Sequence, residues 1–337
     1  MSLLANKIKD TDYLSISARI KAMETGLLTR ERMEQVLEAR SDEEAVKILQ
    51  ECGYPELNPK DPEAMDGALS AAREATLSDL AEGAPDPRYI DVFKLKYDYH
   101  NVKAILKAEA MNTSADSMLM DMGRIPAAEL KEAVQTGRME NLPTGLAAAA
   151  AEAKEILDTT RDPQLSDIVL DRWCYQEMMD VAAATGSAFL AGYVRIQIDA
   201  ANLRALVRTL RMGKSMDFLR TVLLSGGEID ADAVLAAGMS GGGALGELYG
   251  PTRLQAAAES GAEALRGGAL TEFEKLCDDA VSDYLAGAQF VPFGEAPLLG
   301  YLAARETEYT NIRILLMGRS AGLPAGVIRS RLRAGYV

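Results

Sequence analysis

Histidine and cysteine are scarce in this sequence. Its 337 residues include one histidine, His100, and three cysteines, Cys52, Cys174 and Cys277, which lie far apart. A single histidine argues against a histidine-rich metal site, a Ser-His-Asp triad and a Cys-His pair. An odd number of widely spaced cysteines favours a reduced, cytosolic protein over a disulfide framework. We expect no catalytic residue, no metal site and no cofactor site in this chain, and a site that uses the single histidine is the alternative.

Long apolar runs and positive charge are also in short supply. No apolar stretch reaches the roughly 18–20 residues that a membrane span needs, and the start, MSLLANKIKDTDY, has no cleavable signal pattern. The formal net charge is -14. Because an acidic chain repels a phosphate backbone, we expect no nucleic-acid partner. Together these absences predict a cytoplasmic protein.

The residues that are abundant favour helices. Apolar residues make up 48% of the chain and aromatic residues only 6%. Long windows rich in Ala, Leu, Met, Glu and Arg favour helix, because these side chains lose little rotamer freedom there. Alternation of Val, Ile, Thr and Tyr at period two is rare, so strands have little support. We expect an all-α fold, with an N-terminal hairpin whose second helix runs through residues 29–54.

One motif recurs three times along the chain. It has the pattern acid-x-x-Asn-aliphatic-base, and its asparagines are 101 and then 109 residues apart, close to a third of the chain. Repetition at this spacing predicts three diverged copies of one helical unit, with approximate boundaries 1–125, 126–228 and 229–337. The motif residues are Asp98, Asn101 and Lys103; Asp199, Asn202 and Arg204; and Glu308, Asn311 and Arg313.

Asparagine is unusual inside a helix, because its side chain competes for backbone hydrogen bonds. Its recurrence at one point predicts a repeated structural role for the motif residues, such as bonding a neighbouring helix or a carbonyl group at a kink. A ligand-binding role for the asparagine is the alternative.

Glycine marks a new helix start after each copy. The starts are at 123–127, 227–231 and 322–325, where Gly ends one helix and Pro or Asp opens the next. The third start follows its asparagine after 11 residues, against 22 and 25 in the other copies, which predicts a truncated third copy. A similar segment, Gly26-Leu27-Leu28-Thr29, opens the N-terminal hairpin and makes Thr29 a candidate N-cap.

Positive charge is concentrated around the three motifs. Residues 88–107, 189–220 and 305–337 carry net charges of +3, +4 and +4, so the rest of the chain is strongly acidic. One interpretation pairs these basic helices with acidic neighbours inside each unit. A second interpretation is an acidic surface that receives a basic partner and speeds its docking. Both interpretations can hold together.

Two other patterns suggest chemistry but lack the context that it needs. The segment 241–246 has the glycine spacing of a dinucleotide-binding loop, but the residues before it are typical of a helix and not of the required strand. Asp278, Asp279 and Asp283 resemble the acidic Mg²⁺-diphosphate motif of all-helical prenyl-transfer enzymes. Such enzymes need a second acidic cluster, and none is evident in the sequence. We interpret these two patterns as a linker and a solvated helix face.

Several blocks of the sequence resemble one family. At the C-terminal end they are 292–301 (PFGEAPLLGY), 306–314 and 331–337 (RLRAGYV), and at the N-terminal end 13–23 (YLSISARIKAM) and 36–40 (VLEAR). These blocks look like the C subunit of V/A-type rotary ATPases and ATP synthases, called the d subunit in eukaryotic V-ATPases. The Gly-rich segment 239–246 departs from the family pattern.

The resemblance implies a function without chemistry in this chain. It implies three pseudo-threefold-related helical units that form a funnel-shaped socket on the cytoplasmic face of the membrane proteolipid ring. The socket would take the central shaft, made of the D and F subunits, and couple rotation to proton or sodium transport. The membrane would be contacted only through the complex. A free-standing helical adaptor for an unrelated complex is the alternative.

Overall fold

The structure is a computed structural model that describes residues 8–336. Residues 1–7, which form the first half of the stretch searched for a signal pattern, lie outside the described residues, as does Val337 of the last family-like block.

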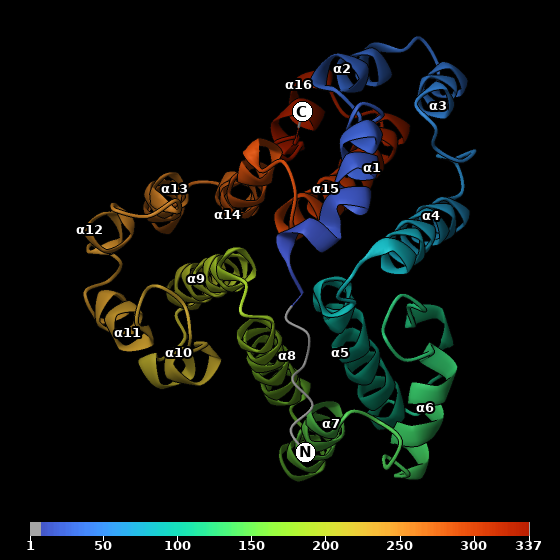
Figure 1. The fold of residues 1–337 in the computed structure, drawn as a ribbon. Coiled ribbons are helices and arrows are strands. Elements are labelled where there is room, and N and C mark those ends of the chain that lie inside the picture. Colours follow the sequence, from blue (N-terminus) through green and yellow to red (C-terminus); the bar gives the residue numbers. More distant parts are fainter. Residues whose placement is uncertain (1–7, 337) are drawn as a thin grey trace.

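Residues 8–336 form helices and no strand, which confirms the expected all-α class (Figure 1). None of these helices is long and apolar enough to cross a membrane. In chain order they are η1 (Asp10–Tyr13), α1 (Leu14–Glu24), α2 (Arg30–Glu38), α3 (Asp42–Glu51), α4 (Pro62–Gly83), α5 (Arg88–Ala110), η2 (Asp116–Met118), α6 (Ala127–Thr136), α7 (Thr144–Thr160), α8 (Pro163–Thr185), α9 (Ala188–Arg211), α10 (Met216–Val222), α11 (Ala231–Met239), α12 (Leu245–Tyr249), α13 (Gln255–Leu265), α14 (Leu270–Ala286), η3 (Gly287–Phe290), α15 (Glu295–Ser320) and α16 (Ala325–Arg331).

The hairpin expected at residues 29–54 contains two helices where one was predicted. Thr29 caps α2 as expected, because its side chain accepts a hydrogen bond from the Arg32 N–H. The helix then ends at Glu38, and Ala39 is extended with ψ 144°. Ser41 starts α3 by accepting a hydrogen bond from the Glu44 N–H at 3.2 Å. The capping residue Ser41 therefore divides the predicted helix into α2 and α3.

Each motif copy lies on one long helix, α5, α9 or α15, and these three motif helices end alike. Eleven residues after each asparagine stands a residue with left-handed φ: Asn112 at 53°, Gly213 at 64° and Gly322 at 68°. The N–H of the next residue then bonds the carbonyl five residues earlier, at 2.9–3.0 Å in all three cases. This is the Schellman ending of a helix. The spacing from asparagine to helix end is therefore identical in the three copies.

The predicted truncation of the third copy is wrong. Gly322 corresponds to Gly213 and Asn112, which end a motif helix, and it does not correspond to Gly227, which precedes a later helix. Both α10 and α16 begin 14 residues after their asparagine and have seven residues. Glycine occurs both at the end of a motif helix and before a later helix. In the sequence comparison Gly322 was therefore aligned with the wrong glycine of the second copy. The first copy is the shorter one at this point, because the three-residue η2 replaces the helix.

Three clusters of buried apolar side chains form the core. The second cluster lies within residues 196–280. The third cluster combines residues 28–69 with residues 309–328, so α2, α3 and the first half of α4 share a core with α15 and α16. The first cluster contains most of the remaining buried residues, from α1 and from α4 to α9 and α15. Helices α2 and α3, from the N-terminal part of the chain, thus pack beside α15 and α16 from its C-terminal part (Figure 1).

Each motif helix packs against a set of helices, which for α5 and α9 includes the helices that follow it in the chain. Helix α5 contacts α6, α7 and α8, helix α9 contacts α10, α11, α13 and α14, and helix α15 contacts α16, α2, α3 and α4. Helices α4 and α8 lead directly into the next motif helix, and α14 leads into α15 through η3. The set that packs on α15 is therefore completed by the N-terminal part of the chain. The unit boundaries and the pseudo-threefold relation stay predictions.

Candidate functional site at the three motif helices

The three motif asparagines make the same pair of hydrogen bonds. Each side-chain amide donates to the carbonyl of one downstream residue and accepts from the N–H of that same residue. The downstream residues are Met120 for Asn101, Leu224 for Asn202 and Arg333 for Asn311, with distances of 2.8–3.1 Å. All three asparagines are at most 1% exposed. Each amide therefore fixes the loop that returns to its motif helix.

The motif acids bind the backbone that opens the next helix. Asp98 accepts from the N–H groups of Arg124 and Ile125 at 2.9 and 3.3 Å. Asp199 accepts from those of Glu228 and Ile229 at 3.0 and 3.1 Å. Burial raises the pKa of both carboxyl groups, while these N–H groups favour the ionised form. The acids therefore satisfy buried backbone donors that no helix bond reaches.

In the third copy the backbone donor comes from the opposite end of the chain. Glu308 accepts from the N–H of Leu28, 280 residues earlier, and from the hydroxyl of Tyr54 at 2.6 Å. Leu28 immediately precedes the α2 cap, as Ile125 and Ile229 precede the caps of α6 and α11. Segment 26–29 resembles segments 123–126 and 227–230 in sequence. This resemblance indicated the contact between Glu308 and Leu28, but the contact was not predicted from it.

Glycine is required where the motif acids approach the backbone. A Cβ built at Gly227 would overlap Oδ1 of Asp199, and one at Gly123 would overlap Oδ1 of Asp98. These two positions also correspond in the sequence alignment of the copies. The glycines that appeared to be only helix starts therefore also make room for a buried carboxylate.

We expect Gly227→Ala to lower the free energy of unfolding by about 1–3 kcal/mol, because the added methyl group forces Asp199 off its two N–H donors. Gly246→Ala is the matched control, since a Cβ there meets no atom within 4 Å. Urea denaturation of both variants measures the difference. Equal stability of the two variants would contradict the close-packing argument.

The motif bases form ion pairs with a neighbouring helix. Lys103 bonds Asp171 of α8 at 2.5 Å, Arg204 bonds Glu274 of α14 at 3.1 Å and Arg313 bonds Asp66 of α4 at 2.7 Å. Basic motif helices therefore pair with acidic neighbours, as one interpretation expected. Each pair, however, joins two different units of the predicted boundaries 1–125, 126–228 and 229–337 and does not lie inside one unit. Because these pairs are partly exposed, each contributes at most about 1 kcal/mol. The contacts of all nine predicted residues are thus internal to the chain, and their architectural role stays a prediction.

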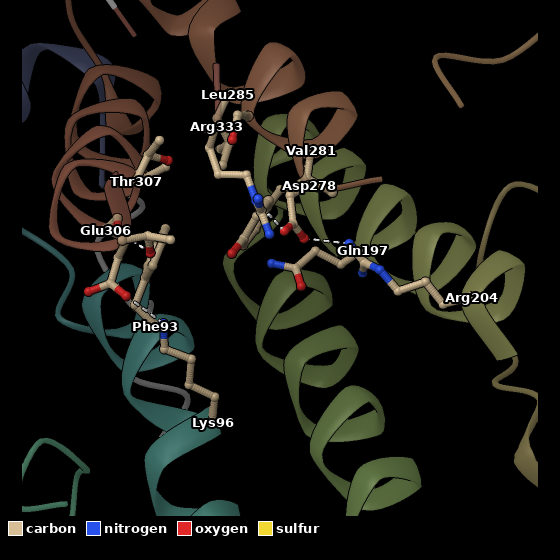
Figure 2. A pocket seen from close by; sticks show the side chains of 14 residues that line it. Phe93, Lys96, Gln197, Arg204, Asp278, Val281, Leu285, Glu306, Thr307 and Arg333 are labelled. Atoms are coloured by element: carbon tan, nitrogen blue, oxygen red, sulfur yellow. Dashed lines mark hydrogen bonds and ion pairs between the residues drawn. The ribbon is translucent and has the colours of Figure 1, made fainter. Parts of the chain in front are cut away.

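A cavity lies where the motif helices meet (Figure 2). It has a volume of about 280 Å³, and its lining includes side chains of α5, α9, α14 and α15. Lys96, Gln197 and Glu306, each five residues before a motif asparagine, all line it. Lys96 Nζ lies 2.7 Å from Glu306 Oε2. Burial alone would raise the pKa of Glu306, but Lys96 and Arg73 outweigh it and hold that pKa below its usual value.

The residues that suggested other chemistry have ordinary partners. Asp278 bonds Arg333, Asp279 bonds Lys275 and Asp283 bonds Arg253. The glycine-rich segment 241–246 follows helix α11 and not a strand. Among residues 8–336 no group of three or more His, Cys, Asp or Glu side chains is placed to hold a metal ion. The ring of His100 bonds the Met118 carbonyl at 3.1 Å.

Known proteins match this chain over nearly its whole length. The C subunit of the V-type sodium ATPase of Enterococcus hirae is 26% identical over 332 residues, which cover 96% of this chain and 99% of that protein. The C subunit of the A-type ATP synthase of Methanocaldococcus jannaschii is 27% identical over 347 residues, with 95% and 86% covered. The family described as ATP synthase (C/AC39) subunit matches residues 16–331. The chain therefore belongs to the ATP synthase (C/AC39) subunit family.

Proposed function

We propose that this chain is the non-catalytic central-rotor subunit of a V/A-type ATPase or ATP synthase. It links the central shaft, made of the D and F subunits, to the membrane proteolipid ring and so couples rotation to proton or sodium transport. The family match over residues 16–331 carries the proposal. In this role the chain works on the cytoplasmic face of the membrane and meets the membrane only through the complex.

The contacts of the motif helices support a pseudo-threefold socket. The same asparagine bonds, helix ends and ion pairs occur at three places, and equivalent positions of three helices line one cavity. We propose three units, each built on one motif helix, with the third assembled from α15 and α16 together with α2–α4. This grouping moves the start of the chain from the first unit to the third. A funnel around the cavity is the shape that we propose for the socket.

The packing also suits a part that transmits torque. The loops after the motif helices are held by hydrogen bonds to buried asparagines, and the third core cluster joins residues 28–69 to residues 309–328. Close-packed interiors have low compressibility and transmit strain. A rotor subunit needs this property and needs no catalytic residue of its own.

We expect the purified chain to retain both the shaft subunits and the proteolipid ring in a pull-down assay. If acidic residues contact a basic shaft, binding weakens as salt is raised from about 0.1 M to 1 M, because the screening length falls from about 10 Å to about 3 Å. Absence of both partners at low salt would contradict the proposal. Stable association with an unrelated complex in place of these subunits would favour the adaptor alternative.

A further inference from the structure

A groove runs beside α4. It lies between α4, α5 and the segment that follows η2, and its volume is about 950 Å³. Its lining is mainly apolar or small, with Gly67, Ala71, Met118 and Met120 among the lining residues. A Cβ built at Gly67 would meet no atom within 4 Å. Met118 and Met120 are 43% and 39% exposed, so the groove presents apolar surface to solvent.

In the third copy the chain itself occupies the corresponding place. Helix α16 contacts both α14 and α15 and buries Ile328, which is 1% exposed. The residues after it continue onto α14, where Arg333 bonds Asp278 and the Ala334 N–H bonds Asp279, both at 2.7 Å. A short amphipathic helix therefore closes this junction between a motif helix and the helix that precedes it.

In the first copy nothing in the described part of the chain closes that junction. The three-residue η2 stands where α16 has seven residues, and the described hydrogen bonds include none between α4 and residues 111–126. Helices α4 and α14 can be aligned on Asp66 and Glu274, because each of these acids pairs with a motif arginine. In this alignment Ser70 and Ala71 of α4 correspond to Asp278 and Asp279 of α14. Ser70 and Ala71 both line the groove.

The charges of the groove favour a basic occupant. Its lysines are neutralised, because Lys103 pairs with Asp171 and Lys107 with Asp167. Glu63 and Glu74 line the groove, are exposed, and take part in no ion pair among the described residues. The free charges at the groove are therefore negative. Helix α16 has the complementary chemistry, with Val327 and Ile328 next to arginines, and its Arg329 bonds Glu34 at 2.7 Å.

We propose that the groove between α4 and α5 binds a short amphipathic helix of a partner protein. The helix presents two adjacent aliphatic side chains to the methionines and alanines of the groove and Lys or Arg to Glu63 and Glu74. It takes the place that α16 takes in the third copy. The proposal does not depend on the identity of the shaft or the ring, because it rests on the difference between the copies.

The probe for this proposal is a fluorescent peptide of residues 322–335, GLPAGVIRSRLRAG, added to the full-length chain. A peptide this short is only marginally helical alone, so we expect saturable but weak binding, with a Kd of about 10 µM to 1 mM. Ala71→Trp should weaken binding at least about tenfold by filling the groove. Glu63→Lys and Glu74→Lys should each weaken it about threefold. Fluorescence anisotropy measures all of these affinities.

Two controls separate the groove from other causes. Ala75→Trp places the same side chain on an exposed position of α4 outside the groove lining and should bind like the parent chain. A peptide with Ile328→Asp should not bind. Equal affinity of the parent chain and Ala71→Trp, with both variants folded by thermal melting, would overturn the proposal, and so would the absence of saturable binding by the parent chain. Neither result bears on binding of the shaft or ring, which the pull-down tests separately.

Discussion

Replacing Glu308 with alanine should lower the free energy of unfolding by about 3–5 kcal/mol, the loss expected when one partner of a buried ion pair is removed. The Glu308 side chain is 9% exposed and lies 2.8 Å from the Arg305 guanidinium. Its loss leaves this guanidinium buried without its partner and removes the acceptor of the Leu28 N–H and the Tyr54 hydroxyl.

The effect should extend to both ends of the chain, since Glu308 joins α15 to the start of α2. Arg305 also lies 5.0 Å from the ring centroids of Tyr54 and Tyr309, so its displacement disturbs the third core cluster. Hydrogen exchange at the Leu28 amide should become faster in the variant, and urea denaturation measures the loss of stability. Glu43→Ala is the control, because its 3.5 Å pair with Lys60 is exposed and contributes less than about 1 kcal/mol. Similar losses in the two variants would contradict the account.

Asn202→Leu should lower the free energy of unfolding by about 1–3 kcal/mol, because leucine leaves the N–H and the carbonyl of Leu224 without partners in the core. Both bonds are 2.8 Å long and Asn202 is fully buried. Urea denaturation and thermal melting provide the measurement.

Asn101→Leu and Asn311→Leu are matched variants, since they remove the same two bonds in the other copies. If the three copies share one architecture, their losses should agree within about 1 kcal/mol. Unchanged melting temperatures would refute an architectural role for the motif and return the ligand alternative to consideration.

The sequence predicted the features that depend on local pattern. The helical class, the motif helices and the pairing of basic motif helices with acidic neighbours follow from composition, spacing and charge. The pairs of Lys103, Arg204 and Arg313 nevertheless cross the predicted unit boundaries. The break at Ser41 was missed because one capping serine interrupts a pattern that is helical on both sides. The role of Gly322 was misassigned because glycine ends helices in more than one context, and its counterpart Asn112 carries a different side chain.

Features that join distant parts of the chain were harder to predict. The bond between Glu308 and Leu28 spans 280 residues, and only the likeness of segment 26–29 to two later segments indicated it. The cavity at Lys96, Gln197 and Glu306 had no sequence signal, because equivalent positions carry a base, an amide and an acid. Lys96 and Glu306 form an ion pair, and a search for the same residue type at equivalent positions does not reveal such a pair.

The rotor assignment is tested most directly by observing rotation. A gold particle can be attached through Asp217→Cys, whose side chain is 93% exposed, in a complex immobilised by its catalytic sector. The parent cysteines Cys174 and Cys277 are buried, and Cys52 is replaced by serine to prevent labelling there. The account predicts that the particle rotates in one direction when ATP is added. A particle that is attached to the assembled complex and stays stationary, while ATP is hydrolysed and the shaft turns, would contradict it.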